Sequence, residues 1–162
     1  MTLRVYIAGP DVFRPDAKDW ADEVRALCVA HGCEALVPLD GDHATPEAIY
    51  ASNVALVQRA DAVLANLNPF RGAEPDSGTC FEVGFATALG KRVVGYMASG
   101  ESIAARVARM EGSAPSARPV DAQGMHVENF GLPLNLMLAV PASIVIGDIK
   151  DALRALVGTR NP

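Results

Sequence analysis

Residues 61–72 read DAVLANLNPFRG, an apolar run that ends in asparagines, a proline and a glycine. A short apolar run bounded by such turn residues is typical of a strand buried on both faces of a sheet. The next segment, 78–89, places Phe81, Phe85 and Leu89 at helical spacing, and 92–97 returns to a strand-like run, RVVGYM. This strand–loop–helix–strand order predicts a parallel sheet with right-handed crossovers.

The alternation of strands and helices extends to both ends of the sequence. The expected strands are 3–8, 34–38, 61–67, 92–97 and 143–147, and the expected helices are 16–31, 45–59, 78–89, 101–110, 134–140 and 148–157. This order predicts an α/β fold with a doubly wound five-stranded parallel sheet, a flavodoxin-like three-layer sandwich. Residues 39–43 and 111–124 are expected to be loops, the second with a composition that suits a mobile lid.

Length and composition bound the class of protein. The 162 residues, 17.0 kDa in mass, predict a single domain over 1–162. A mean hydropathy of +0.18 is too high for a disordered chain, and no apolar run approaches the roughly 20 residues of a membrane helix. A net charge of −5 argues against a nucleic-acid partner. We expect a cytoplasmic protein that acts on small molecules, with no membrane partner and no targeting segment.

The cysteines and histidines are scattered. They are Cys28, Cys33, Cys80, His31, His43 and His126. They form no CxxC, HExxH or HxH grouping, so neither a disulfide framework nor a metal site is expected. The chain also lacks the GxGxxG, GxxxxGK[ST] and GxSxG patterns, which disfavours dinucleotides, nucleoside triphosphates and serine hydrolase chemistry.

Acidic residues gather where ligands bind in a doubly wound sheet, beyond the carboxyl ends of the strands. Asp76 follows the strand 61–67, and Glu82 lies in the second turn of the helix after it. Glu82 is either a solvated helix acid or a pocket acid that faces Asp76 and Tyr6. Paired carboxyl groups around a small site are what cleavage of a glycosidic bond requires.

Four ordered stretches carry a resemblance to a known family. They are YIAGPDVF at 6–13, DAVLANLNPFRG at 61–72, EPDSGTCFEVGFATALGKRVVGY at 74–96 and NFGLPLNLML at 129–138. Together they resemble the nucleoside 2-deoxyribosyltransferases. The resemblance implies a doubly wound α/β enzyme without a cofactor. Such an enzyme cleaves the N-glycosidic bond of a 2′-deoxynucleoside and passes the sugar to another free base.

The resemblance also implies catalytic roles. Glu82 matches the family's nucleophile, which forms a covalent deoxyribosyl ester. Tyr6 matches a tyrosine whose hydroxyl bonds to that nucleophile, and Asp76 matches an aspartate that contacts the substrate. Without the resemblance, Tyr6 would be a strand residue with its ring in the core, and Asp76 would cap a helix.

Other implied contacts lie in three segments. Asn135 and Met137 match a segment that a neighbouring subunit supplies, so a homodimer or larger homo-oligomer is implied. The alternative is a buried amphipathic turn within one subunit. Asp11 and Phe13 follow Gly9, where an aromatic ring could stack on a base; the alternative is a helix cap with a hydrophobic staple.

Three positions leave specificity open. Eight residues before Asp61 the best-known branch of the family has an aspartate, whereas this chain has Asn53. An amide can hydrogen-bond a base or sugar but cannot transfer a proton. Protonation of the leaving base would then fall to Asp76 or to water, or the base specificity would differ. The alternative is that Asn53 merely faces solvent. Gly78 begins a helix whose free amides attract anions. Arg71 either contacts substrate or pairs with Glu74.

Three functions remain open from the sequence. The first is transfer of deoxyribose between bases. The second is an N-glycoside hydrolase for nucleosides or nucleotides, in which water attacks the same ester. The third is a non-enzymatic module that binds a small ligand or a flavin, which the fold alone would permit.

Overall fold

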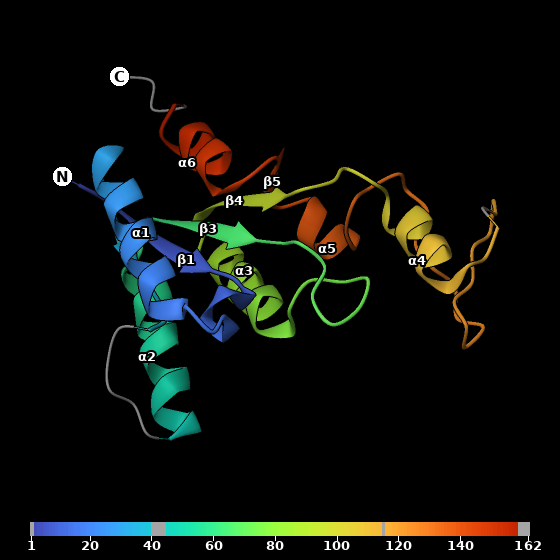
Figure 1. The fold of residues 1–162 in the computed structure, drawn as a ribbon, viewed down its shortest axis with the longest axis horizontal. Helices are drawn as coiled ribbons and strands as arrows, with labels where there is room; N and C mark the ends of the chain where they lie inside the picture. Colours follow the sequence, from blue (N-terminus) through green and yellow to red (C-terminus); the bar gives the residue numbers. More distant parts are fainter. Residues whose placement is uncertain (1, 40–44, 115, 159–162) are drawn as a thin grey trace.

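The computed structural model describes residues 2–39, 45–114 and 116–158, and within them it contains one five-stranded sheet (Figure 1). The strands are β1 (Leu3–Ala8), β2 (Cys33–Leu36), β3 (Ala62–Asn66), β4 (Arg92–Met97) and β5 (Ser143–Ile146). All neighbouring strands pair in parallel, in the order β2-β1-β3-β4-β5. The predicted flavodoxin-like topology is confirmed.

The helices follow the predicted order. They are η1 (Pro10–Phe13), α1 (Ala17–Ala30), α2 (Pro46–Arg59), α3 (Ser77–Ala88), α4 (Ile103–Glu111), α5 (Leu136–Ala139) and α6 (Ile149–Gly158). The short 3-10 helix η1 was not predicted. It replaces a simple turn because Pro10 has the backbone angle that suits a first helical position. Of the predicted loop 39–43, residues 40–43 lie outside the described residues.

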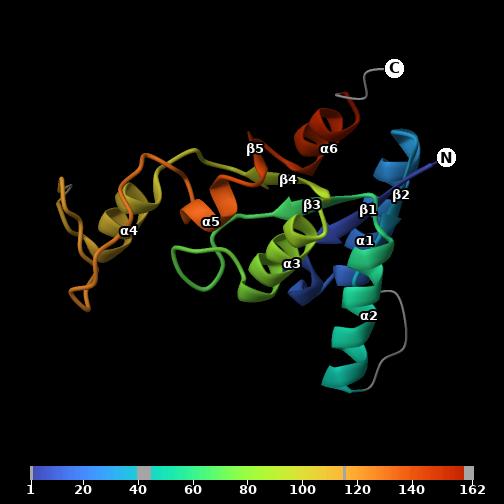
Figure 2. The same ribbon diagram turned by 180° about the vertical axis from the view of Figure 1, so that it is seen from behind.

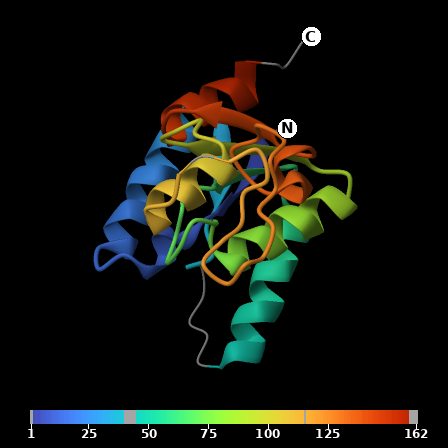
Figure 3. The same cartoon turned by 90° about the vertical axis from the view of Figure 1, so that its right-hand side faces the viewer.

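The sheet separates two apolar cores. Helices α1 and α6 pack on one face, against Val5 and Ile7 of β1. Helices α2, α3 and α5 pack on the other face, against Tyr6 and Ala8. Figure 3 shows α1 and α3 on opposite sides of the strands. Because side chains alternate along a strand, Tyr6 points toward α3.

The strand order reverses at β1 and β3, where their carboxyl ends lie side by side. A Cβ atom at Gly9, directly after β1, would come within 2.8 Å of the Asn66 Cβ atom at the end of β3. The chain can therefore leave β1 this close to β3 only if residue 9 is a glycine. This crevice is where ligands bind in doubly wound sheets.

Residues 103–114 and 116–135, which we call the arm, comprise α4 and the chain after it. Figures 1 and 2 show the arm extending away from the sheet on the side of the strands' carboxyl ends. Apart from α4, its regular structure is one antiparallel bridge between Val120 and His126. None of the helices in the described ranges has the length and apolarity to span a membrane.

Candidate active site

A hydrogen bond joins Tyr6 and Glu82, which are 76 positions apart in the sequence. The Tyr6 hydroxyl donates to Glu82 Oε1 at 2.6 Å. Tyr6 is fully buried in β1, and Glu82 is half-buried in the second turn of α3. Within the described residues Glu82 Oε2 accepts no hydrogen bond, so this oxygen is available to a ligand. The structure thus brings together the first two predicted catalytic residues.

Burial shifts the titration of both groups. Burial raises the pKa of Glu82 to about 7, with a further increase from the charge of Asp76, while the Tyr6 hydrogen bond opposes the rise. Burial and the neighbouring carboxylate of Glu82 raise the pKa of Tyr6 far above its ordinary value. Tyr6 therefore stays protonated and donates to Glu82. A carboxyl group poised near neutrality in a crevice is typical of a catalytic acid, base or nucleophile.

Asp76 is the N-cap of α3. Its Oδ2 atom accepts hydrogen bonds from the Thr79 amide at 3.0 Å and from the Thr79 hydroxyl at 3.1 Å. The helix starts at Ser77, one residue before the predicted Gly78. The capping alternative for Asp76 is therefore what the structure contains. Capping uses Oδ2 and leaves Oδ1 for a ligand. The negative charge of Asp76 also contributes to the raised pKa of Glu82.

Asp11 belongs to a chain of polar side chains across the strand ends. Asn66 Nδ2 donates to Asp11 Oδ2 at 2.7 Å, and Asn68 Nδ2 donates to Asn66 Oδ1 at 2.8 Å. The Ala98 amide then donates to Asn68 Oδ1 at 2.9 Å. This chain links the segments after β1, β3 and β4. The predicted helix-cap alternative for Asp11 is wrong, because its carboxylate is bound to Asn66 instead.

Phe13 lies on the surface, with 58% of it exposed, and stacks on Phe70 at 5.7 Å between ring centroids. Arg71 covers both rings, with its guanidinium carbon 5.2 Å from the Phe13 centroid and 4.6 Å from the Phe70 centroid. This cation–π contact, rather than an ion pair with Glu74, is what the structure shows for Arg71. The three side chains tie η1 to the loop after β3.

Asn53 is half-buried in α2. One turn earlier on the same helix, the Tyr50 ring contacts the Phe81 ring, with 5.9 Å between the ring centroids. Phe81 directly precedes Glu82 in the sequence. Asn53 therefore lies near the side of α2 that faces α3, with part of its surface exposed to solvent.

Asn135 is the N-cap of α5, which packs against α3. Its Oδ1 accepts from the Met137 amide at 2.9 Å, and its Nδ2 donates to Glu128 Oε1 at 2.7 Å. Glu128 Oε2 accepts from the Leu136 amide at 2.9 Å, so one carboxylate holds the start of the helix. Met137 is 72% exposed, whereas Leu138 is buried. The turn is therefore amphipathic, which fits the alternative of an amphipathic turn within one subunit as well as a segment that reaches a neighbouring subunit.

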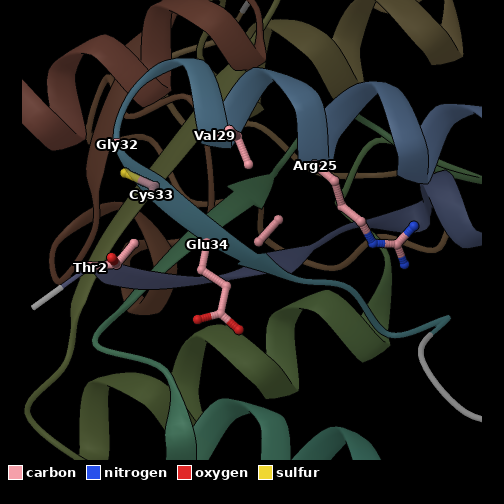
Figure 4. A pocket seen from close by; sticks show the side chains of 7 residues that line it. Thr2, Arg25, Val29, Gly32, Cys33 and Glu34 are labelled. Carbon is pink, nitrogen blue, oxygen red and sulfur yellow. The ribbon is translucent and has the colours of Figure 1, made fainter.

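A cavity of about 420 Å³ lies along residues 70–77 and is lined by Phe70, Arg71 and Asp76, among others. A second cavity, of about 570 Å³, lies at the edge strand β2 between Arg25, Cys33 and Glu34 (Figure 4). Cys33 begins β2, so the second cavity lies at the amino ends of the strands. Only the first cavity adjoins the predicted site residues.

Sequence reasoning missed three residues at this end of the molecule: Asn66, Arg106 and Glu128. Asn66 could have been found as the polar residue that ends a buried strand. Arg106 follows Ile103 by three positions, so an arginine occupies the apolar stripe of its helix. Glu128 carries no signal in the sequence, because its partners follow seven and eight residues later in an irregular segment.

The family model for nucleoside 2-deoxyribosyltransferases matches residues 5–137. The chain belongs to this family. The matched range contains Tyr6, Asp76, Glu82 and Asn135, which are four of the predicted site residues. A 2-desoxiribosyltransferase from Leishmania mexicana is similar in structure, with a TM-score of 0.81 and 34% identity over 98% of this chain and 99% of that chain.

Two further relatives are more distant. The CMP N-glycosidase of Clostridium botulinum has a TM-score of 0.52 and 16% identity over 94% of this chain and 97% of that chain, which shows a shared fold. An uncharacterized protein of Schizosaccharomyces pombe, C191.05c, is 33% identical over 59% of this chain. That match covers about half of the yeast protein's own length.

The described residues hold no group of three or more His, Cys, Asp or Glu side chains placed to bind a metal ion. The candidate site is built from a tyrosine, carboxylates and amides. These groups can supply a nucleophile, hydrogen bonds and a proton.

Proposed function

We propose that this protein is a nucleoside 2-deoxyribosyltransferase in which Glu82 is the nucleophile. The observation that carries the proposal is the 2.6 Å bond from a buried tyrosine to one oxygen of Glu82, which leaves the other oxygen unbonded in the described residues. The family membership and the Leishmania mexicana enzyme of similar structure support the same activity.

The reaction is a double displacement. Glu82 Oε2 attacks C1′ of a 2′-deoxynucleoside, and the C1′–N bond breaks as the electron pair passes to the base, which takes up a proton. The nitrogen of a second base then attacks C1′ of the ester, the ester C1′–O bond breaks to release the carboxylate, and the incoming nitrogen gives up its proton to the group that protonated the first base. Two inversions give net retention. A 2′-hydroxyl would destabilise the cation-like transition state and needs room beside Glu82, so deoxy substrates are preferred.

Tyr6 orients the nucleophile and stabilises its charged form. The hydrogen bond lowers the pKa of Glu82 against the effect of burial, so more of the carboxylate is ionised at neutral pH. The bond also fixes Oε1, which presents Oε2 to the anomeric carbon. Such preorganisation reduces the reorganisation that the transition state requires.

Substrate contacts are proposed for the residues around this pair. We assign Asp76 Oδ1 to the substrate and to protonation of the leaving base. The amide of Asn53 is too weak an acid to transfer a proton, so its proposed role is hydrogen bonding to the base. Gly9, Asp11 and Phe13 line the strand-end crevice, with Phe13 as the stacking surface for a base. Gly78 lies in the first turn of α3, whose N-terminus Asp76 already caps.

We further propose a homo-oligomer in which Asn135 and Met137 complete the site of a neighbouring subunit. Apolar exposure around them supports this, because Met137 and Val140 are each 72% exposed and Phe130 is 68% exposed. Exposed apolar residues gathered in one segment are typical of an interface. Exchange of bases between nucleosides would place the enzyme in cytoplasmic nucleoside salvage.

The test of the activity is chromatography of purified protein with a panel of 2′-deoxynucleosides, each with and without a different free base. A new nucleoside, formed only in the presence of the acceptor, is the expected result. Free base released at the same rate with or without acceptor would make the protein a hydrolase. No turnover of any deoxynucleoside, ribonucleoside or 5′-monophosphate would refute the proposal.

The shared site is tested by mixing an inactive variant with a weakened one. Glu82→Ala lacks the nucleophile, and Asn135→Ala lacks the complementing residue. If sites form between subunits, a mixed oligomer regains some complete sites, and activity rises above that of Asn135→Ala after the variants are unfolded and refolded together. If each subunit holds a whole site, the mixture is no more active than its Asn135→Ala component.

A further inference from the structure

Arg106 is buried, with only 2% of its surface exposed, although its side chain carries a positive charge. Burying a charge is unfavourable unless hydrogen bonds and counter-charges replace the lost water. Within the described ranges it is the one charged residue among those buried in the fold. The groups that contact Arg106 therefore indicate the role of its buried charge.

The guanidinium binds three backbone carbonyls. Nη1 donates to Ala73 O at 3.1 Å and to Pro133 O at 3.0 Å, and Nη2 donates to Glu101 O at 3.0 Å. The Glu101 carboxylate lies 3.9 Å from Nε. The planar fork of an arginine can satisfy these acceptors together, whereas the single ammonium of a lysine cannot.

The two carbonyls on Nη1 belong to the two segments that carry the proposed substrate contacts. Ala73 lies three residues before Asp76, in the loop after β3. Pro133 lies two residues before Asn135, at the end of the arm. One nitrogen atom therefore joins the loop that leads to Asp76 to the segment that leads to Asn135.

The charges around Arg106 match this arrangement. Glu74 lies in the loop and Glu128 in the arm. Burial and the charge of Glu128 raise the pKa of Glu74, whereas the charge of Arg106 lowers it. Arg106 thus offsets, at Glu74 in the loop, the repulsion from the charge of Glu128 in the arm. Glu101 is paired with both Arg106 and the exposed Arg109.

We propose that Arg106 is a positioning residue for substrate binding, which holds the Asp76 loop and the Asn135 segment in register without touching the substrate. This inference rests on the proposed function. It separates two tasks in the molecule. The Tyr6–Glu82 pair stands on β1 and α3 and does not depend on Arg106, whereas the surrounding contacts do.

The first experiment compares Arg106→Lys with Arg109→Gln. Lysine keeps the charge, but its single ammonium cannot reach all three carbonyls that the two guanidinium nitrogens hold, so we expect KM for the deoxynucleoside to rise about tenfold. Because Asp76 stays bonded to Thr79 of α3, kcat should change about twofold or less. Arg109→Gln removes a positive charge from the same helix and an ion pair with the same residue, Glu101, but it removes no hydrogen bond to a backbone carbonyl. It should leave KM and kcat unchanged. An unchanged KM in Arg106→Lys, or an equal loss of kcat, would overturn the proposal.

A double-mutant cycle tests the route of the effect. Arg106→Lys should cost less in kcat/KM when Asn135 is already alanine, because the segment it positions has lost its contact. Combined with Tyr6→Phe, Arg106→Lys should keep its full effect. Additivity in the Asn135→Ala background would overturn the proposal even if KM rises.

Hydrogen exchange separates this inference from the proposed function. In Arg106→Lys, the amides of 70–76 and 132–137 should exchange faster together than in Arg109→Gln, while β1 and α3 stay unchanged. This readout needs no substrate. A wild-type protein without transferase activity would therefore refute the proposed function alone, and unchanged exchange in the two segments would refute the role of Arg106.

Discussion

The sheet and the arm contribute to the candidate site in different ways. Tyr6 and Glu82 lie on β1 and α3, whose backbones are fixed by strand pairing and a packed apolar core. Asn135 lies at the end of the arm, where Met110, Met125 and Phe130 are exposed and Glu128 and Arg106 make the connecting hydrogen bonds. The proposed nucleophile therefore lies on the part of the molecule with the packed core. The residues around it are held by a few polar contacts, which are easier to break.

The largest effect is expected from Glu82→Gln. Glutamine keeps the shape and can accept the Tyr6 hydrogen bond, but it cannot form the ester. We expect transferase activity to fall by at least about 10⁴-fold with the fold intact. Activity is measured by chromatography and folding by circular dichroism. Glu23→Gln, which changes an exposed acid in the middle of α1, is the control. Retained activity in Glu82→Gln would show that Glu82 is not the nucleophile.

Tyr6→Phe should have the next largest effect. Loss of a hydrogen bond to a charged group costs about 1.5–3 kcal/mol, so kcat/KM should fall about 10- to 100-fold at neutral pH. The same bond lowers the pKa of Glu82, which lies near 7. In wild type, kcat/KM should fall as the pH drops below about 7, and in Tyr6→Phe this fall should move to higher pH. An unmoved profile would mean that another group titrates.

The stability of the sheet should depend on pH through Glu82. Its folded-state pKa, about 7, is raised from 4.5. Its contribution to folding is therefore fully present below pH 4.5 and is lost as the pH rises through 7. Glu82→Gln stays neutral, so it should match wild type at pH 4.5 and be more stable by about 1–3 kcal/mol at pH 8. Urea unfolding at both pH values measures this, and an equal difference at both would contradict it.

The smallest effect is expected in the arm, from Glu128→Gln. The amide keeps one acceptor for Leu136 or Asn135 but loses the charge and the second acceptor, so Asn135 becomes less well held. We expect KM to rise by about two- to fivefold with kcat unchanged. Glu47→Gln, an exposed residue in the first turn of α2, is the control. A large fall in kcat would place Glu128 with the reacting groups rather than with the arm.

The strand-end residues show how far sequence patterns reach. The run at 61–67, the helix after it and the fold class followed from hydrophobic periodicity, and the observed element bounds differ from the predicted ones by two residues or fewer at each end. Asp76 was predicted to contact substrate, and the structure shows that one of its carboxylate oxygens accepts the hydrogen bond that caps α3. Capping depends on where the helix begins, which periodicity leaves uncertain by a residue or two.

The sequence by itself determined the parallel sheet, the order of its elements and the chemical types at the strand ends, because these follow from local periodicity and turn residues. The contact between Tyr6 and Glu82 was implied by the family resemblance, and the structure contains it. Only the tertiary structure decided that Asn66 binds Asp11 and that Arg106 joins the loop to the arm. These last contacts link residues 55, 33 and 27 positions apart. Local sequence patterns carry no information on which distant polar groups meet, since that depends on how the whole chain packs.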